Sequence, residues 1–577
     1  MPNFLAMSFE GTLAPSFDLR CLHPGHKLPD GWGIGFYPGD EPAAIVLKEP
    51  APPSGSIRSE LIKVWEHLES SLFLLHIRTA TWGNLADANT QPFKRAWARR
   101  DWLLAHSGSL THRLDLTPSP HFEPIGSTDT ELLFCELMST IASNGWRSIG
   151  DVDPLRLQLW FDSINEHGSM TMVLTDGLDL CVYADRNDQG GVFVWELLPP
   201  YGRVVFGDQD LEVDLSRRGI KSRKGVLVSS DLLLANGDHA SNWRRLAPGS
   251  LMVVRQGAIR VDLPALPRRD DAPRTNIAAR PAPRLPARQE PKELTVTHRT
   301  VYRYTRPVER SMHVLRLIPV HDRLQTLIES DIQVSVEGKT RDYDDVFGNR
   351  ARRVLIETPF SEMIIEGRSR VRVLDSDPLG YRPLRARSAL PLVWMPWQRE
   401  VLQPFLLPIE LPESELYELT EYAMSFVQRN DADLLDTLLD MNVSIYGEYE
   451  YKQGTTKLTT SAFDTYASRV GVCQDFANLF ICLARLLSVP ARYTCGYIYT
   501  GPVAHRMSEA SHAWAQVYLP EVGWRGFDPT NGILTQTDHV RVAVGRNFRD
   551  ATPTSGTIYV GGGDETLEVA VQVELAT

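Results

Sequence analysis

Three side chains in the second half of the chain are of the types needed for covalent acyl transfer: Cys473, His512 and Asp528. A thiol, an imidazole and a carboxylate are the nucleophile, the base and the orienting group of an activated thiol site. A free thiol is only a few per cent ionised near neutral pH, so it needs a neighbouring base to become reactive. If the fold brings the three together, they predict acyl transfer through a thioester.

The thiol is predicted to lie in the first turn of a helix that continues to about residue 487. One apolar face is defined by side chains at helical spacing: Phe476, Phe480, Leu483 and Leu487. Unpaired N–H groups and the positive end of the helix dipole favour a thiolate in the first turn, and the same N–H groups can hold a developing oxyanion. We expect Gly471, just before the helix, to let a substrate acyl group approach the backbone closely.

The imidazole and the carboxylate are predicted to lie on one hairpin. Residues 512–519 form an alternating strand, residues 520–523 are typical of a turn, and a second strand ends at Asp528. Antiparallel pairing brings the two ends together, so that a carboxylate oxygen of Asp528 accepts from one nitrogen of His512. The other nitrogen is then free to pair with Cys473.

Each of these residues also has a purely structural interpretation. A cysteine within an apolar helix is more often a small buried side chain than a nucleophile, and Cys482 fits that description. A single histidine or aspartate is more often a buried polar residue with satisfied hydrogen bonds. The combination of all three at these spacings favours a catalytic site.

The composition is that of a soluble globular protein with several domains. The chain has 577 residues, 43% hydrophobic and 23% charged, which is too long for one core and suggests three or four folded units. A net charge of -12 argues against nucleic acid or a membrane surface as a partner. Six scattered cysteines, with neither a signal peptide nor a spanning segment in view, predict a reducing cytoplasm.

The sequence pattern divides the chain into four parts. Residues 264–292, rich in proline, alanine and arginine, predict a semi-stiff linker, although a docked loop of one large domain is the alternative. Strand-like runs and a helix at 128–143 predict an α/β domain over 1–263. Short period-2 runs predict a β module over 293–400, and helices followed by strands predict a catalytic core over 401–577.

Long motifs of the second half resemble those of bacterial transglutaminase-like proteins: GVCQDFANLFICLARLLSVPARYTCGY, ASHAWAQVYLPEVGWRGFDPTNG and HVRVAVGRNFRDATPTSG. The preceding THRTVYRYTRPVERSMHVLRLIPV and DDVFGN resemble the β-rich N-terminal domain of that family. The resemblance spans about residues 293–563. It implies a papain-like core with Cys473, His512 and Asp528 as its triad and no calcium site, whereas Asn478 departs from a histidine common at its position.

Members of such families either cross-link glutamine to amines or hydrolyse amide or isopeptide bonds with the same triad. We expect hydrolysis or amide exchange on a peptide, isopeptide or amide substrate, because no amine pocket is recognisable. Glutamine cross-linking and a non-catalytic scaffold are the alternatives. Protein partners cannot be predicted from the sequence.

The first 260 residues resemble a class II glutamine amidotransferase domain, through MPNFLAMSF, DGWGIGFY, HIRTATWG, NTQPF, DWLLAHSG, GSTDTE and MVLTDG. In that family a cysteine follows the initiator Met, and an Asn before a glycine contributes to the oxyanion hole. Pro2 and Ser107, the latter followed by Gly108, stand at those places here. The resemblance implies a multidomain α+β protein whose N-terminal α/β-β-α sandwich lacks glutaminase chemistry.

Arg78 and Asp129 are at the positions that in this family bind the carboxylate and the amine of glutamine. A pocket for a glutamyl or glutaminyl group is therefore expected to survive. The alternative is that Arg78 is a paired cation at a strand end and Asp129 a helix N-cap.

No metal or cofactor is expected. Cys21, His23 and His26 form a short cluster, but no second ligand pair follows at zinc spacing. A surface loop is the favoured interpretation.

Overall fold

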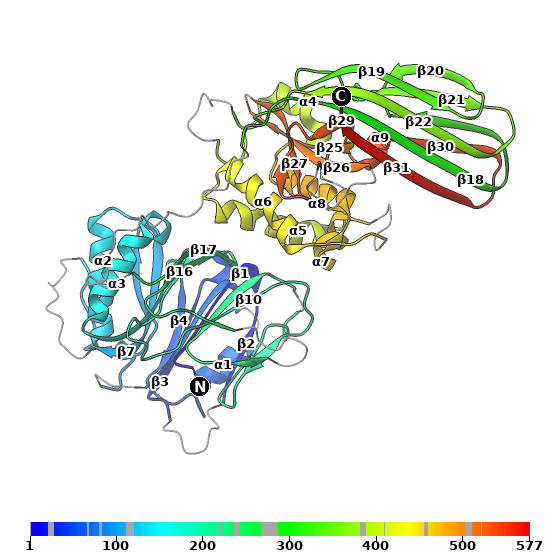
Figure 1. Cartoon of the computed structure of the whole chain (residues 1–577). Coiled ribbons are helices and arrows are strands. Elements are labelled where there is room, and N and C mark those ends of the chain that lie inside the picture. Colours follow the sequence, from blue (N-terminus) through cyan, green and yellow to red (C-terminus); the bar gives the residue numbers. More distant parts are fainter. Residues whose placement is uncertain are drawn as a thin grey trace. The chain divides into compact units, whose positions relative to one another are not determined.

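The structure, a computed structural model, describes residues 2–20, 28–65, 68–79, 84–110, 121–219, 221–235, 243–266, 287–380, 388–408, 410–454, 460–501, 511–520 and 522–576. It contains two compact units, Met1–Arg280 and Pro281–Thr577. Both units combine strands and helices, which confirms the multidomain α+β prediction (Figure 1). The cluster of Cys21, His23 and His26 and most of the expected linker lie outside the described residues. Within the described ranges, no helix has both the length and the apolar character needed to cross a membrane.

The N-terminal unit stacks two large antiparallel sheets. The first has the order β15 (Arg244–Arg245), β10 (Phe193–Leu197), β13 (Gly225–Ser229), β1 (Phe4–Leu13), β5 (Ser70–Arg78), β3 (Gly31–Phe36) and β4 (Ile45–Glu49). The second has the order β17 (Ala258–Leu263), β16 (Leu251–Arg255), β9 (Asp179–Tyr183), β8 (Gly168–Thr175), β7 (Arg100–Leu110) and β6 (Phe93–Trp97). Apolar side chains of both sheets, among them Phe4 and Val173, share one core.

Helices cover the outer faces of this pair of sheets. The apolar sides of α2 (Asp129–Ser143) and α3 (Pro154–Asn165) pack against the second sheet around Phe134 and Phe161. The first sheet packs against α1 (Ile57–Val64) and a small sheet of β14 (Leu234–Ala235), β11 (Val205–Gly207), β12 (Leu211–Asp214) and β2 (Ser16–Leu19). The layers are those of the expected sandwich, because alternating strands bury one face in the shared core and leave the other for helices.

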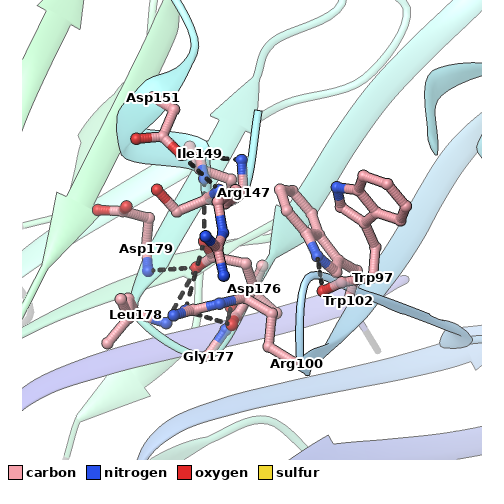
Figure 2. A network of polar contacts seen from close by, with 12 residues as sticks. Trp97, Arg100, Trp102, Arg147, Ile149, Asp151, Asp176, Gly177, Leu178 and Asp179 are labelled. Atoms are coloured by element: carbon pink, nitrogen blue, oxygen red, sulfur yellow. Dashed lines mark hydrogen bonds and ion pairs between the residues drawn. The ribbon is translucent and has the colours of Figure 1, made fainter. Parts of the chain in front are cut away.

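A buried carboxylate, Asp176, organises the turn between β8 and β9. Its Oδ1 accepts from the backbone N–H groups of Leu178 and Asp179 at 3.0 and 2.9 Å, and its Oδ2 accepts from Ile149 N at 2.9 Å (Figure 2). The Arg100 guanidinium donates to the backbone oxygen of Asp176 at 3.3 Å. One side chain thus satisfies three donors from two segments, which fixes the short helix at Ile149–Asp151 against the sheet.

Replacing Asp176 with alanine is expected to lower the free energy of unfolding of the N-terminal unit by about 3–5 kcal/mol, because it leaves buried N–H groups without acceptors. Urea denaturation followed by tryptophan fluorescence measures the change. The control is Asp151→Ala, since Asp151 is exposed and its carboxylate accepts from the N–H groups of Arg147 and Ser148, so that the change should cost about 1 kcal/mol. Equal losses for the two variants would contradict the prediction.

The β module of the second unit is built around one long strand, β18 (Lys292–Leu315). The sheet order is β19 (Gln325–Val334), β22 (Phe360–Val373), β18, β21 (Arg350–Ile356) and β20 (Lys339–Asp344). The last strands of the chain, β30 (Thr554–Gly561) and β31 (Glu565–Leu575), also pair with β18 (Figure 1).

The long strand differs from the short runs expected from the sequence. Its register with β22 shifts between Arg303 and Val308, a stretch that contains Pro307. Before this shift β18 pairs with β22 and β31, and after it mainly with β21 and β30. Proline interrupts the ladder because it has no N–H to donate, but a change of partners at that point lets the strand continue.

The remaining elements form an α+β core. Its helices are α4 (Pro396–Leu406), α5 (Glu413–Arg429), α6 (Leu434–Glu448), α7 (Ala462–Ser468), α8 (Cys473–Leu486) and α9 (Phe548–Ala551). Its sheet has the order β28 (Ile533–Leu534), β27 (Gly523–Asp528), β26 (His512–Leu519), β25 (Ala491–Ile498) and β29 (His539–Gly545). The largely buried helix α8 packs between other helices and β26, and the rings of Phe480 and Phe527 stack with their centres 5.4 Å apart (Figure 1).

Candidate active site

Cys473 is the first residue of α8 and lies beside a cavity of about 300 Å³. The helix begins here because Val472 is its N-cap, and Asp475 Oδ2 accepts from Val472 N at 2.9 Å. The thiol is therefore next to the unpaired N–H groups of the first turn, as expected from the apolar spacing. Cys482, farther along the same helix, is fully buried and is not among the described residues that line this cavity.

The role expected for Gly471 is not supported. A Cβ at this position would lie 3.0 Å from both Asp475 Cβ and Phe476 Cε1. The space beside the glycine is therefore filled by the first turn of α8 and is not left for a substrate.

The predicted hairpin is present, and it brings His512 and Asp528 together. Ala515 pairs with Phe527 and Leu519 with Gly523, so Asp528 falls opposite Trp514 and its side chain lies on the same face as His512. His512 Nε2 and Asp528 Oδ2 are 2.8 Å apart, and both side chains are completely buried. His512 Nδ1 makes no standard hydrogen bond to any described residue and belongs to a ring that lines the same cavity as Cys473.

The electrostatics of the pair favour an imidazolium beside a carboxylate. Burial alone would lower the pKa of His512, but Asp528 and the neighbouring thiol of Cys473 raise it from 6.5 to about 10. Burial alone would raise the pKa of Asp528, but the two histidines that bond to it hold its pKa well below the usual range. His512 is thus able to hold a proton at neutral pH.

The cavity beside the thiol is lined by aromatic and neutral polar groups. Apart from the two candidate catalytic residues, His512 and Cys473, its described lining residues are of uncharged types: Tyr451, Gln453, Gly454, Val472, Gln474, Tyr493, Cys495, Ser511, Ala513 and Phe548. Burial, with a further contribution from Cys473, raises the pKa of the Cys495 thiol to about 12. Cys495 is therefore a neutral thiol that shares the cavity with the candidate nucleophile.

Three residues around Asp528 were not predicted to belong to the site. Asn531 Nδ2 and His539 Nε2 donate to Asp528 Oδ2 at 2.7 and 3.3 Å, and Thr530 N donates to Oδ1 at 3.1 Å. His539 is the first residue of the HVRVAVG motif, which is part of the resemblance to the family. That motif was the one sequence signal that could have pointed to His539. No spacing rule links it to the hairpin, because it lies on β29.

The nitrogen and oxygen atoms of His512, Asp528 and His539 lie within 4.8 Å of one another, close enough to share a metal ion. Asp528 Oδ2 already accepts from both imidazoles and from Asn531. Hydrogen bonds alone therefore explain why these side chains converge.

The loop that leads to the thiol is held by a buried cation, Arg469. It caps α7 in the left-handed conformation, with φ of 56°, and its guanidinium lies 4.9, 4.7 and 4.8 Å from the ring centres of Tyr422, Tyr449 and Tyr466. Its Nη1 donates to the hydroxyls of Tyr449 and Tyr422 at 2.7 and 3.1 Å. The cage fixes the backbone four residues before Cys473.

Replacing Arg469 with methionine is expected to lower the free energy of unfolding of the C-terminal unit by about 3–5 kcal/mol, because it removes a cation from a largely buried setting, where Glu448 lies 3.7 Å from the guanidinium. Urea denaturation measures the loss. Arg546→Met is the control, since Arg546 pairs with Asp550 at the surface and should cost at most about 1 kcal/mol. A loss at Arg469 no larger than at Arg546 would contradict the prediction.

In the N-terminal unit, four of the expected pocket residues line one cavity of about 550 Å³: Arg78, Ser107, Gly108 and Asp129. Arg78 ends β5 and is 4% exposed, and burial lowers the pKa of its guanidinium. Gly108 has φ of 142°, and a Cβ there would meet Ser169 O at 2.2 Å, so the position requires glycine.

Pro2 is buried but is not among the described lining residues, whereas its neighbour Asn3 is. The Asn3 carboxamide donates to Ser107 Oγ at 3.0 Å.

Asp129 is the first residue of α2 and not its N-cap: Thr128 takes that role, and its side chain accepts from Glu131 N. A hydroxyl caps as well as a carboxylate does, so the cap leaves Asp129 facing the cavity.

Comparison with known proteins identifies three regions. Residues 1–276 match the class-II glutamine amidotransferases. Residues 294–372 match the bacterial transglutaminase-like N-terminal region, and residues 421–529 match the transglutaminase-like superfamily.

Two relatives each align with somewhat less than half of this chain. The uncharacterized protein MJ1515 of Methanocaldococcus jannaschii is 31% identical over 260 residues, which are 44% of this chain and 70% of that protein. The uncharacterized protein Rv2569c of Mycobacterium tuberculosis is 31% identical over 297 residues, 48% of this chain and 91% of that protein. Among solved structures, the periplasmic domain of TgpA from Pseudomonas aeruginosa has a TM-score of 0.23 and 16% identity, covering 40% of this chain and 87% of the other.

The order of these regions agrees with the motifs and with the two compact units. The chain therefore belongs to the class-II glutamine amidotransferases through its first 276 residues and to the bacterial transglutaminase-like proteins through residues 294–372 and 421–529.

Proposed function

We propose that the C-terminal unit transfers acyl groups of peptide, isopeptide or amide substrates through a thioester on Cys473, with hydrolysis or amide exchange as the favoured outcome. The observation that carries this proposal is the buried pair of His512 Nε2 and Asp528 Oδ2 at 2.8 Å, whose imidazole lines one cavity with the thiol. It supplies a nucleophile, a base and an orienting carboxylate in one place.

In the first half of the reaction, the thiolate of Cys473 attacks the acyl carbon. The C–N bond then breaks, and the imidazolium of His512 donates its proton to the departing amine. N–H groups at the start of α8 stabilise the negative oxygen of the tetrahedral intermediate. In the second half, neutral His512 takes a proton from water or an amine as this acceptor attacks the thioester, and the thiolate and imidazolium return.

Selective labelling of the thiol tests the active-site pairing. A limiting amount of iodoacetamide, followed by peptide mapping, should modify Cys473 at least about tenfold faster than any other cysteine. His512→Ala should abolish the preference. Uniform slow labelling of all cysteines would instead favour a non-catalytic scaffold.

The acceptor is tested by direct competition. The full chain is incubated with a glutaminyl peptide, a γ-glutamyl-lysine isopeptide and biotin-labelled cadaverine, and hydrolysis and amine incorporation are measured together. Faster hydrolysis supports the proposal. Amine incorporation that outruns hydrolysis identifies the protein as a cross-linking transglutaminase.

The rate on an amide substrate should fall as pH rises through about 10. The reason is that the pKa of His512 is raised from 6.5 to about 10, so the imidazolium that protonates the leaving amine persists up to that range and is lost above it. The titratable groups beside this ring are Asp528, His539 and Cys473. A profile of kcat/KM against pH checks the prediction, and an alkaline limb near 7 would contradict it.

We also propose that the N-terminal cavity binds a glutamyl or glutaminyl group without glutaminase chemistry. Support comes from the buried Arg78 cation and from Asp129 at the wall of one cavity, which complement the carboxylate and the amine of an amino acid. Isothermal titration calorimetry with glutamine and with a γ-glutamyl dipeptide tests this. Heat that disappears in Arg78→Ala is the expected result, and no heat with either probe overturns the proposal.

We propose the cytoplasm as the compartment. The five cysteines among the described residues are not in disulfides, and a thiol nucleophile works only while reduced. Fractionation of cells, with thiols blocked at lysis, tests this proposal, and recovery of the chain from an oxidising compartment would overturn it.

A further inference from the structure

The carboxylate of Asp528 is shared by two imidazoles. Besides His512 at 2.8 Å, its Oδ2 accepts from His539 Nε2 at 3.3 Å and from Asn531 Nδ2 at 2.7 Å. Acyl transfer by a triad uses one histidine, so the second imidazole has no role in the reaction described above.

The hydrogen bond to Asp528 determines which nitrogen of His539 carries a hydrogen. An ionised carboxylate only accepts hydrogen bonds, so Nε2 of His539 must carry a hydrogen. Its Nδ1 is buried and has no hydrogen-bond partner among the described residues. The hydrogen on Nε2 is therefore directed at Asp528, and this is the bond through which the ring acts on the carboxylate.

Packing holds the second ring in this position. Trp514 lies edge-on to His539, with ring centres 5.3 Å apart, and its ring centre is 5.7 Å from that of His512. The indole fits over Gly496, where a Cβ would come within 2.6 Å of it. His539 itself pairs with Ile498 at the start of β29. The ring is thus clamped by its own strand and by the indole, with little freedom to leave the carboxylate.

We propose that His539 is a positioning residue for the acyl-transfer reaction: it holds the Asp528 carboxylate in the orientation that His512 requires and draws negative charge from the oxygen that His512 faces. This inference rests on the proposed function of the C-terminal unit. Three donors around one oxygen restrict rotation of the carboxylate, as partners behind a ligating or catalytic histidine do elsewhere. Loss of one donor leaves Oδ2 more negative and binds the proton of His512 more tightly.

The experiment compares His539→Phe, which keeps a ring but has no N–H, with His539→Gln, whose carboxamide can still donate. Full-length proteins are assayed with EDTA present. The readouts are kcat/KM on the glutaminyl peptide and the γ-glutamyl-lysine isopeptide, and the pH dependence of Cys473 alkylation. For His539→Phe we expect kcat/KM to fall about 10- to 100-fold with little change in KM, and the alkaline limb to move to higher pH. His539→Gln should restore most of the rate and the original limb.

A matched control is His313→Phe, which removes a buried histidine from the β module, where His313 bonds to Ser311. Melting temperatures of all variants separate loss of fold from loss of positioning. The inference is overturned if His539→Phe leaves the limb unmoved, if its rate loss equals that of His313→Phe, or if His539→Gln restores nothing.

The two proposals can fail separately. If the wild-type chain shows no turnover that depends on Cys473, the proposed function fails. The pH dependence of Cys473 alkylation needs no substrate and still reports on the pair of thiol and imidazole. If the pH dependence of alkylation shifts in His539→Phe and returns to its wild-type position in His539→Gln, the positioning role is supported even without turnover.

Discussion

Replacing Cys473 with alanine is expected to lower kcat/KM on the glutaminyl peptide and the γ-glutamyl-lysine isopeptide by roughly 10⁴-fold or more, because the thioester cannot form. The change removes one sulfur atom at the edge of a cavity, where the side chain is 7% exposed, so the fold should be retained. Steady-state rates and capture of the acyl-enzyme by mass spectrometry measure the effect.

Cys482→Ala is the matched control, because this cysteine is on the same helix, is fully buried and does not line the described part of the cavity. It should keep its rate and lose about 1 kcal/mol of stability through the small void. A Cys473→Ala variant that keeps more than about a tenth of the activity would contradict the assignment of the nucleophile. So would an equal loss in both variants.

Asp528→Asn is expected to lower kcat/KM by roughly 10⁴-fold, because an amide in this place supports the wrong tautomer of His512. It should also lower the free energy of unfolding by about 3–5 kcal/mol, since two buried imidazoles lose their charged acceptor. Kinetics on the same substrates and urea denaturation measure the two effects.

The pH profile provides a further readout of this substitution. Asp528 is the main group that raises the pKa of His512 to about 10, and without its charge burial lowers that pKa. The alkaline limb of the residual activity should therefore move from about 10 toward or below 6.5. The control Asp342→Asn removes an exposed carboxylate paired with Arg352 and should cost at most about 1 kcal/mol with no shift. An unchanged limb in Asp528→Asn would show that this carboxylate does not act on His512.

Local patterns were sufficient to place the three candidate catalytic residues. The apolar spacing from Phe476 onward determines where α8 begins, and so puts Cys473 in its first turn. The turn before Gly523 sets the hairpin register, and the two-residue period of a strand then puts Asp528 and His512 on one face. These predictions depend on neighbours within one turn of helix or one hairpin, and such contacts are encoded in short stretches of sequence.

The sequence also placed two residues of the N-terminal pocket at the ends of their elements. Arg78 at a strand end and Asp129 at a helix start follow from local alternation and from the Ser-Thr-Asp start signal. That the cap is Thr128 was not distinguishable, because adjacent hydroxyl and carboxylate side chains are both good caps.

Only the tertiary structure decided which distant segments complete these elements. β30 and β31 pair with β18, although more than half of the second unit lies between them in the sequence. His539 reaches Asp528 because β29 pairs with β25 and because Gly496 leaves room for the Trp514 ring. A periodic pattern tells which face of a strand is apolar, but many strands share that pattern. The choice among them depends on the shape and hydrogen bonding of surfaces that exist only after the chain has folded.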